Sequence, residues 1–164
     1  MLQSFYSTVA QASFTLLGLW WVILQIRYGP WMRDRRIRRA VYDISLYFLL
    51  PGMMSLMSLL ATDVSAIWRV SFAVAGVAGT LEAILSIVHT KGHDSPTRLV
   101  DLGNWASLVL YPAIAAIAIR RTIPKEIGIH LRPLETEGIL VATLLALGVL
   151  LGAALFVTAD DTDA

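Results

Sequence analysis

The stretch GILVATLLALGVLLGAALFV, residues 138–157, decides the class of this fold because it contains no charged side chain. A transmembrane helix needs about 20 consecutive apolar residues to cross the hydrocarbon core of a bilayer. This stretch supplies that length without interruption. The sequence therefore predicts a membrane-spanning helix here.

Four earlier stretches approach the same length and the same apolar character. They cover residues 5–26, 41–60, 66–89 and 102–119. None shows the alternation of period two, with aromatic girdles, that a membrane β-barrel strand needs. We therefore expect an all-α polytopic integral membrane helix bundle with about five transmembrane helices. It forms a single domain over residues 1–164, which ends in an acidic tail, residues 158–164.

The composition of the chain agrees with a membrane location. Of 164 residues, 57% are hydrophobic and 15% are charged, whereas soluble domains have roughly 45–50% and about 25%. The chain has no cysteine, which excludes disulfides and thiolate metal sites. Hydrolase motifs such as HExxH and GxSxG do not occur, nor does a glycine-rich phosphate loop. We expect no enzyme activity, cofactor, metal site or nucleic-acid partner.

The basic residues are concentrated in one connection, with an expected break at Gly29-Pro30. They are Arg27, Arg33, Arg35, Arg36, Arg38 and Arg39. Because positive charge is retained on the cytoplasmic side of a membrane, the 27–39 loop is expected in the cytoplasm and the N-terminus outside. We expect the chain in the cytoplasmic membrane of a prokaryote.

The 102–119 stretch allows two topologies. If it crosses, the basic residues of the loop 120–137 lie outside, against the charge rule. If it re-enters, that conflict disappears and the acidic tail lies outside. We favour crossing, because the first loop carries the densest charge and such a loop usually dominates.

The first stretch carries one polar stripe along its length, formed by Ser7, Gln11, Thr15, Gly18 and Gln25. Spacings of 4, 7 and 14 residues place side chains on one helix face. The stripe covers about 27 Å at 1.5 Å per residue. It either lines a hydrated path or forms hydrogen bonds to neighbouring helices, and the second interpretation is the more common case.

The third stretch contains an intramembrane carboxylate, Glu82, on nearly the same face as Ser86 and His89. Glu82 lies about 10 Å along the axis from the inner end, so its ionised form needs a partner or a hydrated cavity. Intramembrane carboxylates mark functional sites by default. The alternative is an ion pair with an arginine of the basic loop, such as Arg27 or Arg39.

Polar residues from four stretches converge on the cytoplasmic half of the predicted bundle. They are Gln25, Asp43, Glu82, His89, Asp101 and Asn104. Such a cluster suits a cation or proton site, although its carboxylates also suit anchoring of the arginine loop.

Small residues predict close helix packing at two places. Ala75 and Gly79 belong to a small-residue face of the third stretch, and Gly148 and Gly152 form a GxxxG pattern in the last one. Both patterns allow helices to approach closely, within a chain or between copies.

Two functions fit these features. The first is a small oligomeric, channel-like transport protein that passes a cation or proton along Glu82, Ser86, His89, Asp43, Asn104, Gln11, Thr15 and Gln25. A chain this short encloses little volume, so a homo-oligomer is expected. The second is a non-catalytic scaffold or complex subunit. It would bind a partner or anionic lipid headgroups through Arg33, Arg35, Arg36, Arg38 and Arg39.

Overall fold

The structure, a computed structural model, describes residues 2–60, 65–90, 98–126, 128 and 131–160. Its helices are α1 (Leu2–Arg33), α2 (Arg35–Leu60), α3 (Ser65–Thr90), α4 (Arg98–Ile119), α5 (Ile123–Glu126) and α6 (Pro133–Asp160). All but α5 are long and apolar enough to cross a membrane. The all-α membrane bundle with five spans, predicted from the sequence, is confirmed.

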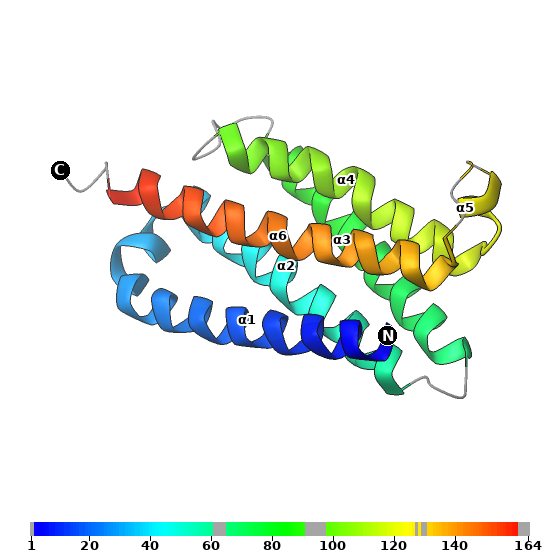
Figure 1. Cartoon of the computed structure of the whole chain (residues 1–164). Coiled ribbons are helices and arrows are strands. Elements are labelled where there is room, and N and C mark those ends of the chain that lie inside the picture. The colour runs from blue at the N-terminus through cyan, green and yellow to red at the C-terminus, as the bar shows by residue number, and fades with distance from the viewer. Residues whose placement is uncertain (1, 61–64, 91–97, 127, 129–130, 161–164) are drawn as a thin grey trace.

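Helix α2 holds the bundle together, because it packs against α1, α3 and α6 (Figure 1). Helix α4 packs against α3 and α6, whereas α1 contacts mainly α2 and is the least buried of the five spans. Helices α1, α3 and α6 finish at the same end of the bundle, and α2 begins there. We call this the arginine end, after Arg33–Arg39. Helix α5 lies at the opposite end.

The basic connection differs from the prediction. A loop was expected over residues 27–39, but α1 continues past Gly29 to Arg33 and α2 begins at Arg35. Asp34 makes this tight turn possible: its Oδ1 accepts a hydrogen bond of 2.8 Å from the backbone N–H of Arg36, as an N-cap residue does. The arginines around it are good helix formers, so the helices extend to the turn.

The 102–119 stretch crosses the bundle and does not re-enter. It forms most of α4, which starts near the arginine end and finishes near α5 (Figure 1). A re-entrant segment would bring both of its ends to the same end of the bundle. Because α4 crosses, α6 returns to the arginine end, where the beginning of the acidic tail lies; residues 161–164 lie outside the described ranges.

Glycines allow close contacts between the helices. A Cβ atom at Gly79 would overlap the ring of Tyr111, and a Cβ at Gly76 would lie 2.8 Å from the backbone nitrogen of Ala115. Both contacts join α3 to α4, and Ala75 of the predicted face is buried beside them. In α6, a Cβ at Gly148 would lie 2.7 Å from the Cβ of Tyr47 in α2.

The GxxxG pattern of α6 therefore packs inside the chain. Gly152, its second glycine, faces Trp20 of α1 and Ile44 of α2 at ordinary contact distances of 3.7 and 3.9 Å from a built Cβ. Of the two roles that the sequence allowed for this face, the structure uses it for packing within one copy.

Candidate functional site: a polar cavity between α2, α3 and α4

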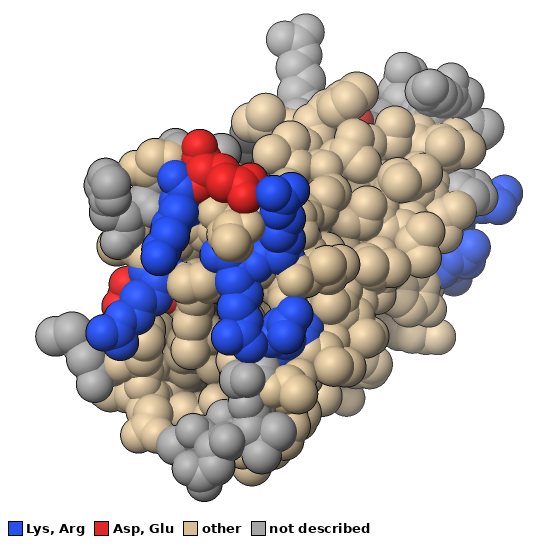
Figure 2. Space-filling model, turned by 90° about the vertical axis from the view of Figure 1, so that its right-hand side faces the viewer, with Lys and Arg blue, Asp and Glu red and all other residues tan. Residues whose placement is uncertain are grey.

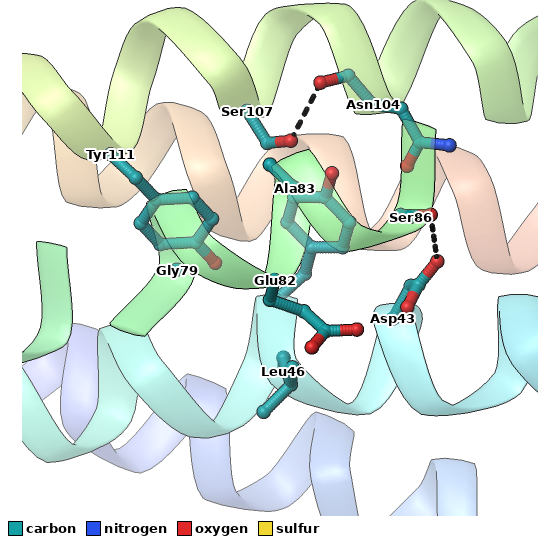
Figure 3. A pocket seen from close by; sticks show the side chains of 10 residues that line it. Asp43, Leu46, Gly79, Glu82, Ala83, Ser86, Asn104, Ser107 and Tyr111 are labelled. Carbon is teal, nitrogen blue, oxygen red and sulfur yellow. Dashed lines mark hydrogen bonds between the residues drawn. The ribbon is translucent and has the colours of Figure 1, made fainter. Parts of the chain in front are cut away.

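A small cavity lies between three helices in the membrane-spanning part of the bundle (Figure 3). Its volume is about 20 Å³, which is room for about one water molecule. Residues of α2, α3 and α4 line it: Asp43, Leu46, Tyr47, Gly79, Glu82, Ala83, Ser86, Asn104, Ser107 and Tyr111. Asp43 and Glu82 lie at similar depth, each about 12 Å along its helix from the arginine end.

Small residues and two tyrosines shape one side of this cavity. The ring of Tyr111 lies over Gly79, where a side chain would collide with it. The ring of Tyr47 stacks on that of Tyr111, with centroids 6.4 Å apart. Tyr47 donates a hydrogen bond of 3.1 Å to the carbonyl of Gly103. The buried hydroxyl of Tyr111 has no hydrogen-bond partner among the described residues, so it can bind a water molecule or an ion in the cavity.

An ion-pair cluster lies on the other side of the cavity. Arg39 donates a hydrogen bond through Nη2 to Oε1 of Glu82, and its Nε lies 3.3 Å from Oδ1 of Asp43. Ser86 donates a hydrogen bond of 2.9 Å to Oδ2 of Asp43 (Figure 3). Arg39 and Asp43 are four residues apart on α2, a spacing that brings side chains together on a helix. One guanidinium therefore faces two carboxylates.

Among the described residues, the charge of this cluster is unbalanced. When Asp43 and Glu82 are both ionised, Arg39 compensates only one of the two negative charges. Asp43 is 9% exposed, Glu82 28% and Arg39 37%, so the least accessible group is a carboxylate. An uncompensated charge is costly away from water. A proton or a monovalent cation would neutralise it.

The arginine that pairs with Glu82 is Arg39. The sequence allowed Arg27 or Arg39, and the contact is with Arg39. Glu82 therefore forms the ion pair that the sequence allowed. The same side chain also lines the cavity.

Only part of the predicted constellation comes together. Asp43, Glu82 and Asn104 of the predicted cluster line the cavity, and so does Ser86 of the predicted route. Asp101 is half-buried in α4 and does not line it. His89 belongs to the last turn of α3, but its side chain lies outside the described residues.

The polar stripe of α1 does not reach the cavity. Gln11, Thr15, Gly18 and Gln25 are exposed on the outer surface of α1. Gln11 donates a hydrogen bond of 3.1 Å to the hydroxyl of Ser7, within the stripe itself. The prediction that this stripe lines a route with the third helix is therefore not met within a single copy of the chain.

The arginines of the basic segment separate into two groups. Arg33, Arg35, Arg36 and Arg38 are exposed around the turn at the arginine end. Arg39, one helical position further, turns toward Asp43 and Glu82 and is half-buried. The first group lies on the surface of the described chain, and Arg39 connects that group to the cavity.

Charged residues also lie at the opposite end of the bundle, which Figure 2 shows. Arg120 forms an ion pair of 2.8 Å with Glu126. The guanidinium of Arg121 lies 5.8 Å from the centroid of the Trp68 ring. Arg69 donates hydrogen bonds of 3.0 and 3.2 Å to the carbonyls of Ala118 and Ile119, which stabilises the C-terminus of α4. These cations are engaged locally.

A second buried carboxyl group, that of Glu137, was not among the predicted site residues. Glu137 is completely buried, and neither of its carboxyl oxygens has a hydrogen-bond partner within the described ranges. Glu137 was expected at the end of the loop 120–137. The missed signal is Pro133, which is favoured at the first position of a helix and places Glu137 one turn inside α6.

Comparison of the chain with protein-family models, with curated proteins and with solved structures found no match.

Proposed function

We propose that this chain is a small transport protein that passes a proton or a monovalent cation, with Glu82 at its intramembrane site. One observation supports this most directly: within the described ranges, Asp43 and Glu82 share one arginine, Arg39, beside a cavity of about 20 Å³. The polar groups of Ser86, Asn104 and Tyr111 add ligands of the kind that such a guest uses.

Arg39 acts in this proposal as an internal competitor of the transported ion. A proton or cation that arrives at Asp43 or Glu82 neutralises that carboxylate and weakens its attraction for the guanidinium. Arg39 is 37% exposed, so it can then turn toward the polar surface. When the ion leaves, Arg39 returns to both carboxylates.

The orientation and the wider setting belong to the same proposal. The arginine end faces the cytoplasm of a prokaryote, and the N-terminus lies outside, as the density of basic residues favours. The chain acts as a homo-oligomer, without a catalytic step, a cofactor or a nucleic acid.

Flux through proteoliposomes tests the proposal. Vesicles that enclose a pH-sensitive dye report proton entry, and potassium and sodium gradients test the monovalent cations. We expect Glu82→Gln and Asp43→Asn to reduce flux at least tenfold. The control is Glu126→Gln, which removes an exposed carboxylate of the opposite end and should leave flux unchanged. Unchanged flux in Glu82→Gln removes Glu82 from the mechanism, and absence of flux in the wild type contradicts transport altogether.

A second candidate function is supported by the exposed arginines. Arg33, Arg35, Arg36 and Arg38 surround one tight turn, and Arg39 anchors this turn to α3 through Glu82. Basic residues near a membrane surface attract anionic headgroups by about 1 kcal/mol each. The chain would then be a non-catalytic scaffold or complex subunit that recognises anionic lipid.

Thermal unfolding in detergent micelles tests this candidate. Added phosphatidylglycerol should raise the melting temperature of the wild type more than phosphatidylcholine does. The difference should disappear when Arg33, Arg35, Arg36 and Arg38 are replaced by Gln. A difference that survives the four replacements rules this segment out as the lipid site.

A further inference from the structure

Helix α1 carries a continuous seam on its outer surface. Its positions are separated alternately by four and three residues: Ser4, Thr8, Gln11, Thr15, Gly18, Val22, Gln25 and Gly29. All of them are exposed, and all except Val22 are polar or glycine. An average repeat of 3.5 residues is the repeat of a left-handed coiled coil.

The seam lies opposite the face of α1 that packs on the bundle. That inner face consists of Tyr6, Val9, Ser13, Trp20 and Leu24, which are all buried. At 3.6 residues per turn, the two sets lie on opposite sides of the helix. A Cβ atom built at Gly18 or Gly29 has no atom within 4 Å. The described part of the chain therefore leaves the seam uncovered.

A bilayer does not tolerate this surface well. The seam lies in the membrane span Leu2–Gly29, and it points away from the bundle, so no internal cavity hydrates it. The carboxamides of Gln11 and Gln25 each carry two donors and one acceptor oxygen. Gln11 uses one donor within the helix, on Ser7. Polar groups without partners are costly in hydrocarbon, so the seam requires a polar partner of matching length.

We propose that this partner is the α1 seam of a second copy of the chain. Two copies inserted in the same direction bring their α1 helices together in parallel, and a two-fold axis then places each position opposite its own counterpart. A carboxamide both donates and accepts, so Gln11 and Gln25 are each complementary to themselves. Gly18 and Gly29 allow the two backbones to approach. This inference rests on the membrane location and does not depend on the transport proposal.

Cysteine cross-linking tests the seam directly, because the wild type contains no cysteine. Val22 and Trp21 are neighbours at the same depth, and they are 52% and 57% exposed. Only Val22 lies on the seam. Under mild oxidation in proteoliposomes, we expect Val22→Cys to form disulfide-linked dimers at least tenfold more than Trp21→Cys, because a disulfide requires Cα atoms about 4.4–6.8 Å apart.

The same experiment at Thr15 and Gly18 should give cross-links, as the seam periodicity requires. Equal yields at Val22 and Trp21, or no cross-link at any seam position, overturn the proposal.

A second measurement removes the polar groups of the seam. Single-molecule photobleaching in lipid vesicles counts the copies per complex. The double variant Gln11→Leu/Gln25→Leu should shift the population from dimers to monomers. The control Thr143→Val removes an exposed hydroxyl of α6 that is bonded to its own helix, and it should remain dimeric. Circular dichroism checks that every variant stays helical.

Dimers that persist in the double variant contradict the proposal that the α1 seams of two copies pair. Neither cross-linking nor photobleaching measures flux, so failure of this inference and failure of the transport proposal are distinguishable.

Discussion

Arg39 and Glu82, which are 43 residues apart in the chain, form an ion pair that joins the start of α2 to α3. The same guanidinium also contacts Asp43, one turn further along α2. Arg39 thereby connects the exposed arginines of the turn to the polar interior of the membrane span. Loss of either carboxylate charge would remove one of the contacts that hold Arg39 at the cavity.

The first prediction concerns the stability of this pair. Arg39→Met leaves two carboxylates side by side and should destabilise the fold by about 1–3 kcal/mol, less than the cost of breaking a fully buried pair because both groups are partly exposed. Glu82→Gln leaves Arg39 with Asp43 and should cost less. A double-mutant cycle, measured by thermal unfolding in micelles, should give a coupling energy above about 0.5 kcal/mol. Additive effects would contradict a direct interaction.

The second prediction compares the two glycines of the GxxxG pattern in α6. Gly148→Ala places a Cβ 2.7 Å from the Cβ of Tyr47 and should destabilise the protein by about 1–3 kcal/mol through overpacking. Gly152→Ala makes only ordinary contacts, and alanine favours a helix by about 1 kcal/mol over glycine. Its melting temperature should stay the same or rise. Equal losses in both variants would show that α6 does not approach α2 as described.

The third prediction concerns Glu137. Its carboxyl oxygens are buried without partners in the described chain, and such groups each cost about 1–3 kcal/mol. Glu137→Met replaces them with apolar atoms on an unbranched side chain and should raise the melting temperature. The control is Glu135→Met in the same helix turn, where the carboxylate accepts a hydrogen bond of 2.9 Å from the backbone N–H of Arg132. Glu135→Met should lower the melting temperature. A lower melting temperature in Glu137→Met would indicate that Glu137 has a stabilising partner.

The fourth prediction compares the contributions of two arginines, Arg69 and Arg120, to stability. Both lie at the end of the bundle where α5 lies. Arg69 bonds to the last carbonyls of α4, and hydrogen bonds to charged groups contribute about 1.5–3 kcal/mol. Arg120 forms an exposed ion pair with Glu126, and such pairs contribute about 0–1 kcal/mol. Arg69→Met should therefore lower the melting temperature clearly more than Arg120→Met. The reverse order would mean that Arg69 does not cap α4.

Much of the fold was predictable because membrane helices follow from local sequence. An apolar stretch that can cross a bilayer must satisfy its backbone internally, so length and composition alone predict a helix. This holds for all five spans. The predicted loop over residues 27–39 was wrong, because one favourable N-cap, Asp34, allows a tight turn between two helices.

The candidate site was predictable only in part. Helical spacing places Glu82 and Ser86 on one face of α3, and the depth of Asp43 and Asn104 follows from their distance to the helix ends. The partner of Glu82, the burial of Glu137 and the size of the cavity depend on how the helices rotate about their axes. That rotation is set by contacts such as Tyr111 over Gly79, which join residues far apart in the chain.

The sequence by itself determined that this protein is a membrane bundle of five helices with carboxylates inside it, because hydrocarbon admits few alternatives to an apolar helix. Only the tertiary structure decided that the polar stripe of α1 faces outward and that one arginine serves two carboxylates. The physical reason is that periodicity shows which residues share a face, whereas the packing of all the helices selects the direction in which that face points.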